Sequence, residues 1–120
     1  PGSFLAPKVI SGVTPDMQIA GTEVFGPVLS VLKTGSEDEA IDIANSTEYG
    51  LVGGIFTADI DAAHRAARRI RAGHIFISEW YAGGVETPFG GYGKSGYGRE
   101  KGREALWNYV QTKNIAYRTR

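Results

Sequence analysis

The amino-acid sequence predicts an α/β fold: a β-α-β-α-β unit with a parallel sheet, then a long glycine-rich loop, a further helix and a terminal strand. Two observations predict this class. Short apolar runs alternate with amphipathic helical patterns, and few residues connect them. Consecutive strands that are joined through helices run parallel, with right-handed crossovers.

Three continuous apolar runs, at residues 28–33, 51–57 and 75–77, predict the strands of this sheet. Runs of this kind are typical of strands that are buried on both faces. A shorter extended run at residues 7–11 and a helical turn at residues 17–21 are expected to precede them.

Two helices are predicted between these strands. The first begins with a capping box, in which Ser36 accepts from the N–H of Glu39 and the glutamate reaches back, and it is expected to fray at Asn45. The second is capped by Asp59 and ends before Gly73, which is expected at the C′ position. The apolar stripe of this second helix comprises Ile60, Ala63, Ala67 and Ile70.

Residues 78–98 have no helical or strand period, and five glycines fall between Gly90 and Gly98. Such a density of glycine indicates either positive φ angles or a close approach of the backbone, and the interleaved aromatic residues favour an ordered loop over a linker. The loop leaves the carboxyl end of a strand, where parallel α/β sheets bind ligands, so we predict the site there. Residues 99–109 then predict a helix, and residues 113–118 alternate as in a strand.

Charge and composition exclude several classes of function. The 13 basic and 13 acidic residues cancel, so neither nucleic acid nor a membrane surface is an expected partner. No apolar run approaches the ~18 residues of a membrane helix, and no secretory signal is visible. The chain has no cysteine, which excludes disulfides and a cysteine nucleophile and is compatible with the expected cytoplasmic location. The sequence begins at proline, so the chain could be either a cloned piece or a proteolytic product of a longer protein.

Other motifs give weaker signals. Residues 91–96 match G-x-G-x-x-G, but no strand directly precedes them and no acidic residue follows about 20 positions on, as a dinucleotide site requires. His64 and His74 have no second ligand at metal spacing, so no metal site is predicted. Glu23, in a loop of glycine and proline, is either a surface carboxylate or a ligand-binding one.

Three segments resemble one enzyme family. Residues 22–28 resemble the E-x-F-G-P-V segment of the NAD(P)-dependent aldehyde dehydrogenases, and residues 48–51 resemble their E-Y-G-L. Residues 88–91 and 95–100 resemble the family's P-F-G-G…S-G-x-G-R-E, and the order and spacing of all three segments match.

The resemblance implies an organisation for the whole chain. Residues 1–112 would form the carboxyl-terminal portion of the catalytic domain, and residues 113–120 an oligomerisation strand. A homo-oligomer would then form through residues 113–118, by addition of this strand to the edge of another sheet.

The resemblance also implies a reaction. In the family a cysteine thiolate attacks a small-molecule aldehyde, hydride passes to NAD or NADP, and a glutamate-activated water hydrolyses the thioester. Both of those residues lie upstream of the region matched here, so we expect no catalytic residue in this chain, no activity of the chain alone, and the missing upstream portion as its partner. The alternative is a non-catalytic association module that retains the fold.

Some binding residues carry over from the family by position. The resemblance implies that Glu23 holds the nicotinamide ribose hydroxyls, that Phe25 packs beside the nicotinamide and that Phe89 lines the aldehyde pocket. The chain departs from many members at two pocket positions, with a serine where asparagine is common and a glycine where an aromatic is common. The expected substrate-pocket residues are therefore Phe89, Ser78, Trp80 and Gly83.

Acidic and aromatic residues gather in the same loop. Trp80 and Tyr81 are adjacent, and Glu79 and Glu86 flank them. A pocket entrance lined by aromatic rings and carboxylates would favour a cationic amino-aldehyde, which is our hypothesis for the substrate.

Overall fold

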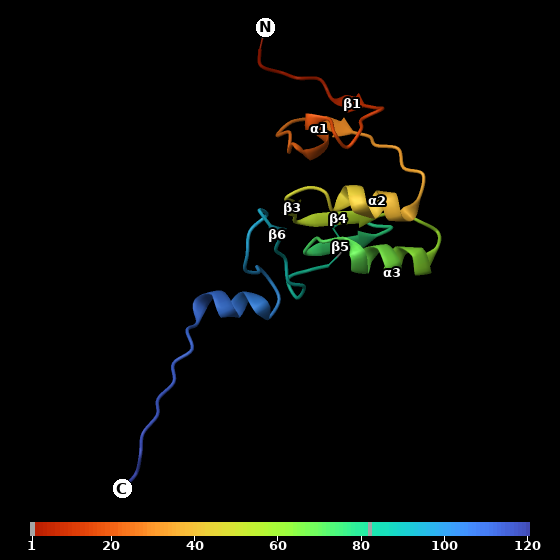
Figure 1. The fold of residues 1–120 in the computed structure, drawn as a ribbon. Helices are drawn as coiled ribbons and strands as arrows, with labels where there is room; N and C mark the ends of the chain where they lie inside the picture. Colours follow the sequence, from red (N-terminus) through yellow and green to blue (C-terminus); the bar gives the residue numbers. More distant parts are fainter. Residues whose placement is uncertain (1, 82) are drawn as a thin grey trace.

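The chain, seen in a computed structural model, comprises an N-terminal unit, a central unit, a glycine-rich loop and a C-terminal arm (Figure 1). Residues 2–81 and 83–120 are described; Pro1 and Ala82, both within the predicted 1–112 portion, lie outside the described residues. The N-terminal unit contains β1 (Lys8–Ile10), α1 (Gln18–Gly21) and β2 (Val28–Ser30). Strands β1 and β2 pair in parallel, with Lys8 opposite Val28, and Val13 is the buried side chain beside them.

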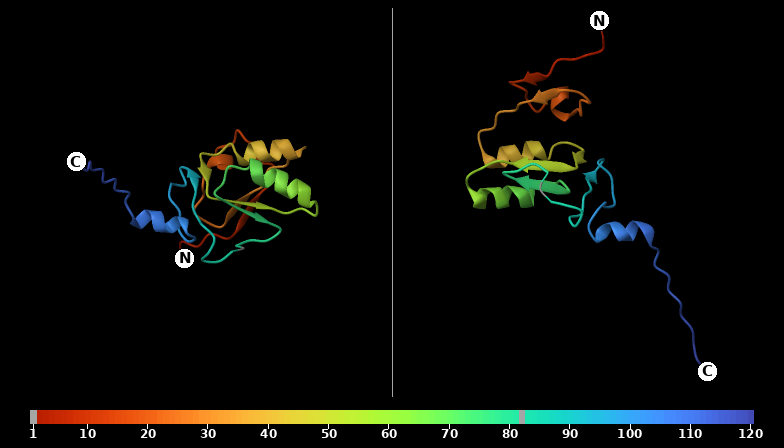
Figure 2. Two further views of the ribbon diagram at one scale, coloured as in Figure 1. Left: turned by 90° about the horizontal axis from the view of Figure 1, so that it is seen from below. Right: turned by 180° about the vertical axis from the view of Figure 1, so that it is seen from behind.

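The central unit contains two helices and a second pair of parallel strands. In chain order these are α2 (Glu37–Ala44), β3 (Tyr49–Gly50), β4 (Val52–Ile55), α3 (Ile60–Arg69) and β5 (His74–Ile77). Strands β4 and β5 pair in parallel along their whole length, and α3 lies against β4 and beside α2 (Figure 2). The buried side chains of this unit are Ile41, Ala63, Ala66 and Phe76.

The α/β class and its parallel strands are confirmed, but the described residues form no single three-stranded sheet. Strand β2 pairs with β1, and β4 pairs with β5, in separate two-stranded sheets. Strand β1 occupies one edge of β2: Lys8 N–H donates to Pro27 O at 2.8 Å and Val31 N–H donates to Ile10 O at 2.8 Å, while no described strand pairs with the other edge. The predicted strand at residues 28–33 is correspondingly shortened to three residues.

Both predicted N-terminal caps are confirmed. Ser36 Oγ accepts from Glu39 N–H at 3.1 Å, and Glu39 Oε2 accepts from Gly35 N–H at 2.7 Å, one residue before the usual partner of a capping box. Asp59 Oδ1 accepts from the N–H groups of Asp61 and Ala62, at 2.9 and 3.0 Å. Short-range capping chemistry therefore determines where α2 and α3 begin.

The predicted stripe of α3 is partly wrong. Ala63 is buried as expected, but Ile60 is 59% exposed and Ala66 is buried in its place. Gly73 is not at the C′ position either, because the helix ends at Arg69 and Ile70 is extended rather than left-handed. A Cβ at Gly73 would lie 1.7 Å from the Gly90 carbonyl oxygen, so this glycine is needed for a close approach of two backbones.

The helix predicted at residues 99–109 is also shorter than expected. The structure has a 3₁₀ helix, η1 (Glu104–Tyr109). Lys101 and Gly102 have φ angles of +58° and +59°, and left-handed residues of this kind interrupt a right-handed helix before it can begin at residue 99.

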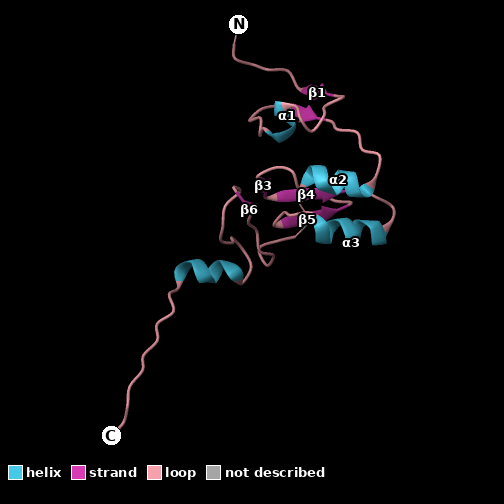
Figure 3. Cartoon of the chain, in the orientation of Figure 1, coloured by secondary structure: helices cyan, strands magenta, loops and turns pink. Residues whose placement is uncertain are grey.

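The C-terminal arm follows η1 as a loop that runs away from the rest of the molecule (Figure 3). Residues 113–118 form no strand within the described chain, so the predicted strand is not present in the single chain, and pairing with another copy stays a prediction. None of the helices in the described residues has the length and apolar character needed to cross a membrane.

The chain exposes far more surface than a compact protein of its size. Its radius of gyration is 19.7 Å, against about 14 Å for a compact chain of this length. Its accessible area is 9990 Å², whereas a compact protein of 12.9 kDa has ~6,300 Å². Large apolar side chains such as Phe4, Phe25 and Tyr97 are almost fully exposed. Apolar area on this scale is typical of a surface that packs against further protein.

Candidate functional site

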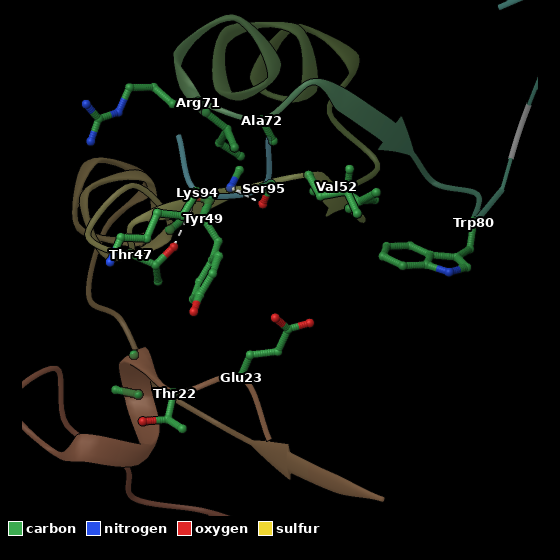
Figure 4. Close-up of a pocket in the computed structure, with 18 residues that line it drawn as sticks. Thr22, Glu23, Thr47, Tyr49, Val52, Arg71, Ala72, Trp80, Lys94 and Ser95 are labelled. Carbon is green, nitrogen blue, oxygen red and sulfur yellow. Dashed lines mark hydrogen bonds between the residues drawn. The ribbon is translucent and has the colours of Figure 1, made fainter. Parts of the chain in front are cut away.

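A hollow of about 700 Å³ lies between the N-terminal unit and the central unit. We call it the Glu23 hollow. Glu23 enters it from the loop before β2, while Tyr49 and Trp80 approach from the central unit and from the segment after β5 (Figure 4). Gly50, Lys94 and Ser95 also line it. Segments that are far apart in the sequence therefore meet here, one of them beyond the carboxyl end of a parallel strand.

The glycine-rich loop is closed at its two ends. Phe89 N–H donates to Glu100 O at 2.7 Å, and Glu100 N–H donates to Phe89 O at 2.7 Å. Between them, Arg99 Nη1 donates across the loop to Gly91 O at 3.1 Å, and its guanidinium lies 5.5 Å from the centre of the Tyr92 ring. The loop is thus held by its own backbone and by one arginine.

The tip of the loop is docked on the segment that precedes β4. Strand β6 (Tyr92–Gly93) pairs antiparallel with β3, and Lys94 N–H donates to Glu48 O at 2.9 Å. Gly50 N–H donates to Ser95 Oγ at 3.0 Å. Lys94 Nζ lies 2.6 Å from Glu48 Oε2, and the hydrogen bond to this carboxylate, together with its charge, raises the pKa of Lys94 above its ordinary value.

Glycine serves two purposes in this loop. Gly96 and Gly98 have φ angles of +99° and +85°, which other residues rarely adopt. A Cβ at Gly91 would instead lie 2.4 Å from Ser95 Cβ, so there the absence of a side chain permits a tight fold.

Aromatic rings form a cluster on the side of β5. The centroids of Phe76 and Trp80 are 5.5 Å apart, and those of Trp80 and Tyr81 are 6.1 Å apart with the rings nearly perpendicular. His74 stacks on Phe76 at 4.7 Å and lies 5.5 Å from Phe89. The cluster therefore links the segment after β5 to the start of the glycine-rich loop.

The structure brings together some of the predicted site residues and not others. Glu23 and Trp80 line the same hollow. Phe89 lines a second hollow of about 390 Å³, which shares the side chains of Leu51 and Ser95 with the first.

Three predicted residues lie away from both hollows. Within the described part of the chain, Phe25, Ser78 and Gly83 line neither of them. Phe25 is 93% exposed. Ser78 has φ +54°, and its hydroxyl donates to Thr57 O at 3.3 Å. Gly83 has φ +100°, so the chain turns sharply after the aromatic pair.

Sequence reasoning missed the contribution of Tyr49, Lys94 and Ser95 to the Glu23 hollow. Tyr49 belongs to the E-Y-G-L segment, and Lys94 with Ser95 belongs to the glycine-rich segment. Tyr49 and Ser95 lie in segments that resemble the family, whereas Lys94 lies between two such segments. Their contact across 45 residues could not be read from either segment alone.

The paired parallel strands, their covering helices and the hollow beyond a strand end define an α/β protein with a candidate ligand site. A sequence model of the aldehyde dehydrogenase family matches residues 1–115. This chain belongs to the aldehyde dehydrogenase family, and the resemblance found in the sequence is confirmed.

Curated relatives share close to half of the residues. Betaine aldehyde dehydrogenase of Brucella anthropi is 50% identical over 114 residues, which cover 95% of this chain and 23% of the relative. The enzyme of the same name from Mesorhizobium japonicum is 49% identical over 118 residues, which cover 98% of this chain and 24% of the relative. The chain thus spans about a quarter of the length of these relatives.

Solved structures share the fold. An NAD-dependent aldehyde dehydrogenase from Sinorhizobium meliloti superposes with a TM-score of 0.87 at 48% identity, over 92% of this chain and 22% of that one. Betaine aldehyde dehydrogenase from Staphylococcus aureus, in complex with NAD+, superposes with a TM-score of 0.89 at 41% identity, over 93% of this chain and 22% of that one.

Proposed function

We propose that this chain forms part of an enzyme that oxidises an aldehyde to a carboxylic acid with NAD(P)+, and that it supplies binding groups rather than the nucleophile. The observation that carries the proposal is the Glu23 carboxylate, which faces a hollow of about 700 Å³ opposite Trp80. The names of the relatives and the NAD+ complex of a similar structure support the choice of reaction and cofactor.

The residues around Glu23 fit a nicotinamide nucleotide. Among the described residues Glu23 forms no ion pair, and an exposed carboxylate can accept two hydrogen bonds from a ribose diol. Phe25 lines neither hollow, but it is two residues from Glu23 and 93% exposed, so its ring is available to pack beside a nicotinamide that extends out of the Glu23 hollow. When bound, the nucleotide would accept the hydride, and this chain's residues would hold its ribose and cover its ring.

The nucleophile has to come from elsewhere. The family reaction needs a thiolate, and the chain has no cysteine. We propose that an upstream portion of the same enzyme supplies it. An NADH-formation assay on the 120-residue chain alone should therefore show no turnover, and clear turnover would refute this assignment.

The aldehyde pocket would be formed on the side of Phe89, Ser78, Trp80 and Gly83. Trp80 is 54% exposed and Tyr81 is 74% exposed, so two aromatic faces are open to a substrate. A quaternary ammonium group binds favourably over such faces, and relatives carry the name betaine aldehyde dehydrogenase. We therefore propose a cationic aldehyde as the substrate. A higher kcat/KM for hexanal than for betaine aldehyde would contradict this.

Glu23→Gln tests the role of the carboxylate. The change keeps the size of the side chain but removes the ionised acceptor, and hydrogen bonds to charged groups contribute about 1.5–3 kcal/mol. In the complete enzyme we expect the KM for the nucleotide to rise roughly 10- to 100-fold, with the KM for the aldehyde unchanged. Glu104→Gln, at the start of η1, is the matched control. An unchanged KM for the nucleotide in Glu23→Gln would contradict the proposed role of this carboxylate.

A second candidate is a non-catalytic association module, which the large exposed apolar surface favours. Under either candidate we propose that residues 113–118 add as a strand to a second copy, because this segment has no strand partner in the described chain. Restoration of NADH formation by an added cysteine-bearing upstream portion distinguishes the enzyme from the module. The cytoplasmic location stays a prediction.

A further inference from the structure

Residues 48–51 take no part in the proposed chemistry, but Gly50 within this segment forms hydrogen bonds through its backbone to two other segments. Its N–H donates to Ser95 Oγ at 3.0 Å, and its carbonyl accepts from Gly73 N–H at 3.0 Å. Gly50 is buried, and a Cβ there would lie 2.4 Å from the Arg71 carbonyl oxygen. One residue thus joins the tip of the glycine-rich loop to the segment that leads into β5.

The same connection leads to Phe89. Gly73 lies against the backbone of Gly90, where a Cβ would be 1.7 Å from the carbonyl oxygen. Gly90 follows Phe89, whose N–H and carbonyl are both bonded to Glu100. The Phe89 ring lies 5.5 Å from the His74 ring at the start of β5. The loop is therefore fixed at its base beside Phe89 and at its tip on Gly50.

We propose that Ser95 is a positioning residue for the aldehyde pocket: its hydroxyl, bonded to Gly50 N–H, seats the glycine-rich loop and so sets the place of the Phe89 ring. This inference rests on the proposed function, since Phe89 has to line the aldehyde pocket for its placement to matter. Ser95 is half-buried and Gly50 is buried, so removal of the hydroxyl leaves the Gly50 N–H without its partner in the protein.

The ion pair of Lys94 with Glu48 assists Ser95. The two charged atoms are 2.6 Å apart, and the side chains remain 68% and 51% exposed. Exposed ion pairs contribute little because water and salt screen them, so the pair has a smaller effect than the serine. The backbone bond from Lys94 N–H to Glu48 O is independent of either side chain and survives their substitution.

The test is Ser95→Ala in the complete enzyme that carries this chain, assayed with a bulky aldehyde, benzaldehyde, and a small one, acetaldehyde. A displaced Phe89 ring affects the aldehyde that fills the pocket. We therefore expect kcat/KM for benzaldehyde to fall about 10-fold, mainly through KM, and that for acetaldehyde to fall less than about 2-fold. Ser95→Thr keeps the hydroxyl and should recover most of the loss.

Controls separate positioning from general loss of structure. Ser46→Ala removes a hydroxyl that donates to Ile43 O at 2.7 Å at the end of α2, and it should leave the ratio of the two kcat/KM values unchanged. Lys94→Met changes an exposed side chain and should shift the ratio in the same direction by a smaller factor, which keeps the test decisive where Ser95→Ala does not fold.

The outcomes are distinct. Equal losses of kcat/KM for both aldehydes in Ser95→Ala overturn this inference and leave the proposed function standing. If Ser95→Ala does not fold, an unchanged ratio of the two kcat/KM values in Lys94→Met has the same consequence. Oxidation of no aldehyde by the unsubstituted enzyme, betaine aldehyde included, overturns the proposed function, and this inference with it.

Discussion

The backbones of Gly73 and Gly90 approach each other so closely that a single added methyl group tests this contact. Gly73→Ala adds one methyl group, whose carbon would lie 1.7 Å from Gly90 O and 2.8 Å from the Gly90 carbonyl carbon. Both neighbours are backbone atoms, so no side-chain rotation can relieve the overlap. Either β5 or the glycine-rich loop must move, and the bond from Gly73 N–H to Gly50 O is the first to be strained.

The cost follows from these contacts. Overpacking a tight site costs about 1–3 kcal/mol, and the loss of one hydrogen bond adds about 1 kcal/mol. We therefore expect Gly73→Ala to lower the free energy of unfolding by about 2–4 kcal/mol in the protein that carries this chain. Urea unfolding followed by tryptophan fluorescence measures it, with Trp80 beside the affected region.

The matched control is Gly21→Ala, at the end of α1. A Cβ there meets nothing within 4 Å, and its φ is not positive, so the same change should alter stability by less than about 0.5 kcal/mol. Equal urea midpoints for Gly73→Ala and the unsubstituted protein would refute the close approach of these two backbones.

Three further results are expected. Ser36→Ala removes the acceptor for Glu39 N–H and should destabilise α2 by about 1 kcal/mol, visible as faster amide exchange of Glu39; unchanged exchange would contradict the cap. The hydrogen bond to Glu48 raises the pKa of Lys94. The pair therefore stabilises the fold fully below the unfolded-state pKa of lysine, and this stabilisation is lost as the pH rises through the folded-state pKa. An NMR titration of Lys94 in Glu48→Gln should show a lower pKa than in the unsubstituted protein. The chain in isolation, with its large exposed apolar area, should self-associate in sedimentation velocity, and a clean monomer would argue against unpartnered faces.

Local chemistry explains which features could be read from the sequence. The caps at Ser36 and Asp59 bind N–H groups two or three residues away, so a short stretch of sequence contains both partners. The apolar runs at residues 51–57 and 75–77 became β4 and β5, as a continuous apolar pattern predicts, but the expected burial on both faces is not seen within this chain, where Phe76 is the one buried residue of the two strands. The matched family segments came from residue types and spacing alone.

Tertiary contacts decided the rest, because their partners are distant in the chain. Nothing around residues 28–33 reveals that β1 will take the edge of β2. Ala66 rather than Ile60 is buried because the position of α3 against β4 and α2 selects the inward face. Gly73 resembles a helix-ending glycine in the sequence, but its need for a bare Cα comes from Gly90, on a different segment. The sequence by itself determined the two capped helices, the strands around them and the family. Only the folded chain decided which glycines, hydroxyls and rings are in contact, because those contacts depend on loop closure and packing rather than on local preference.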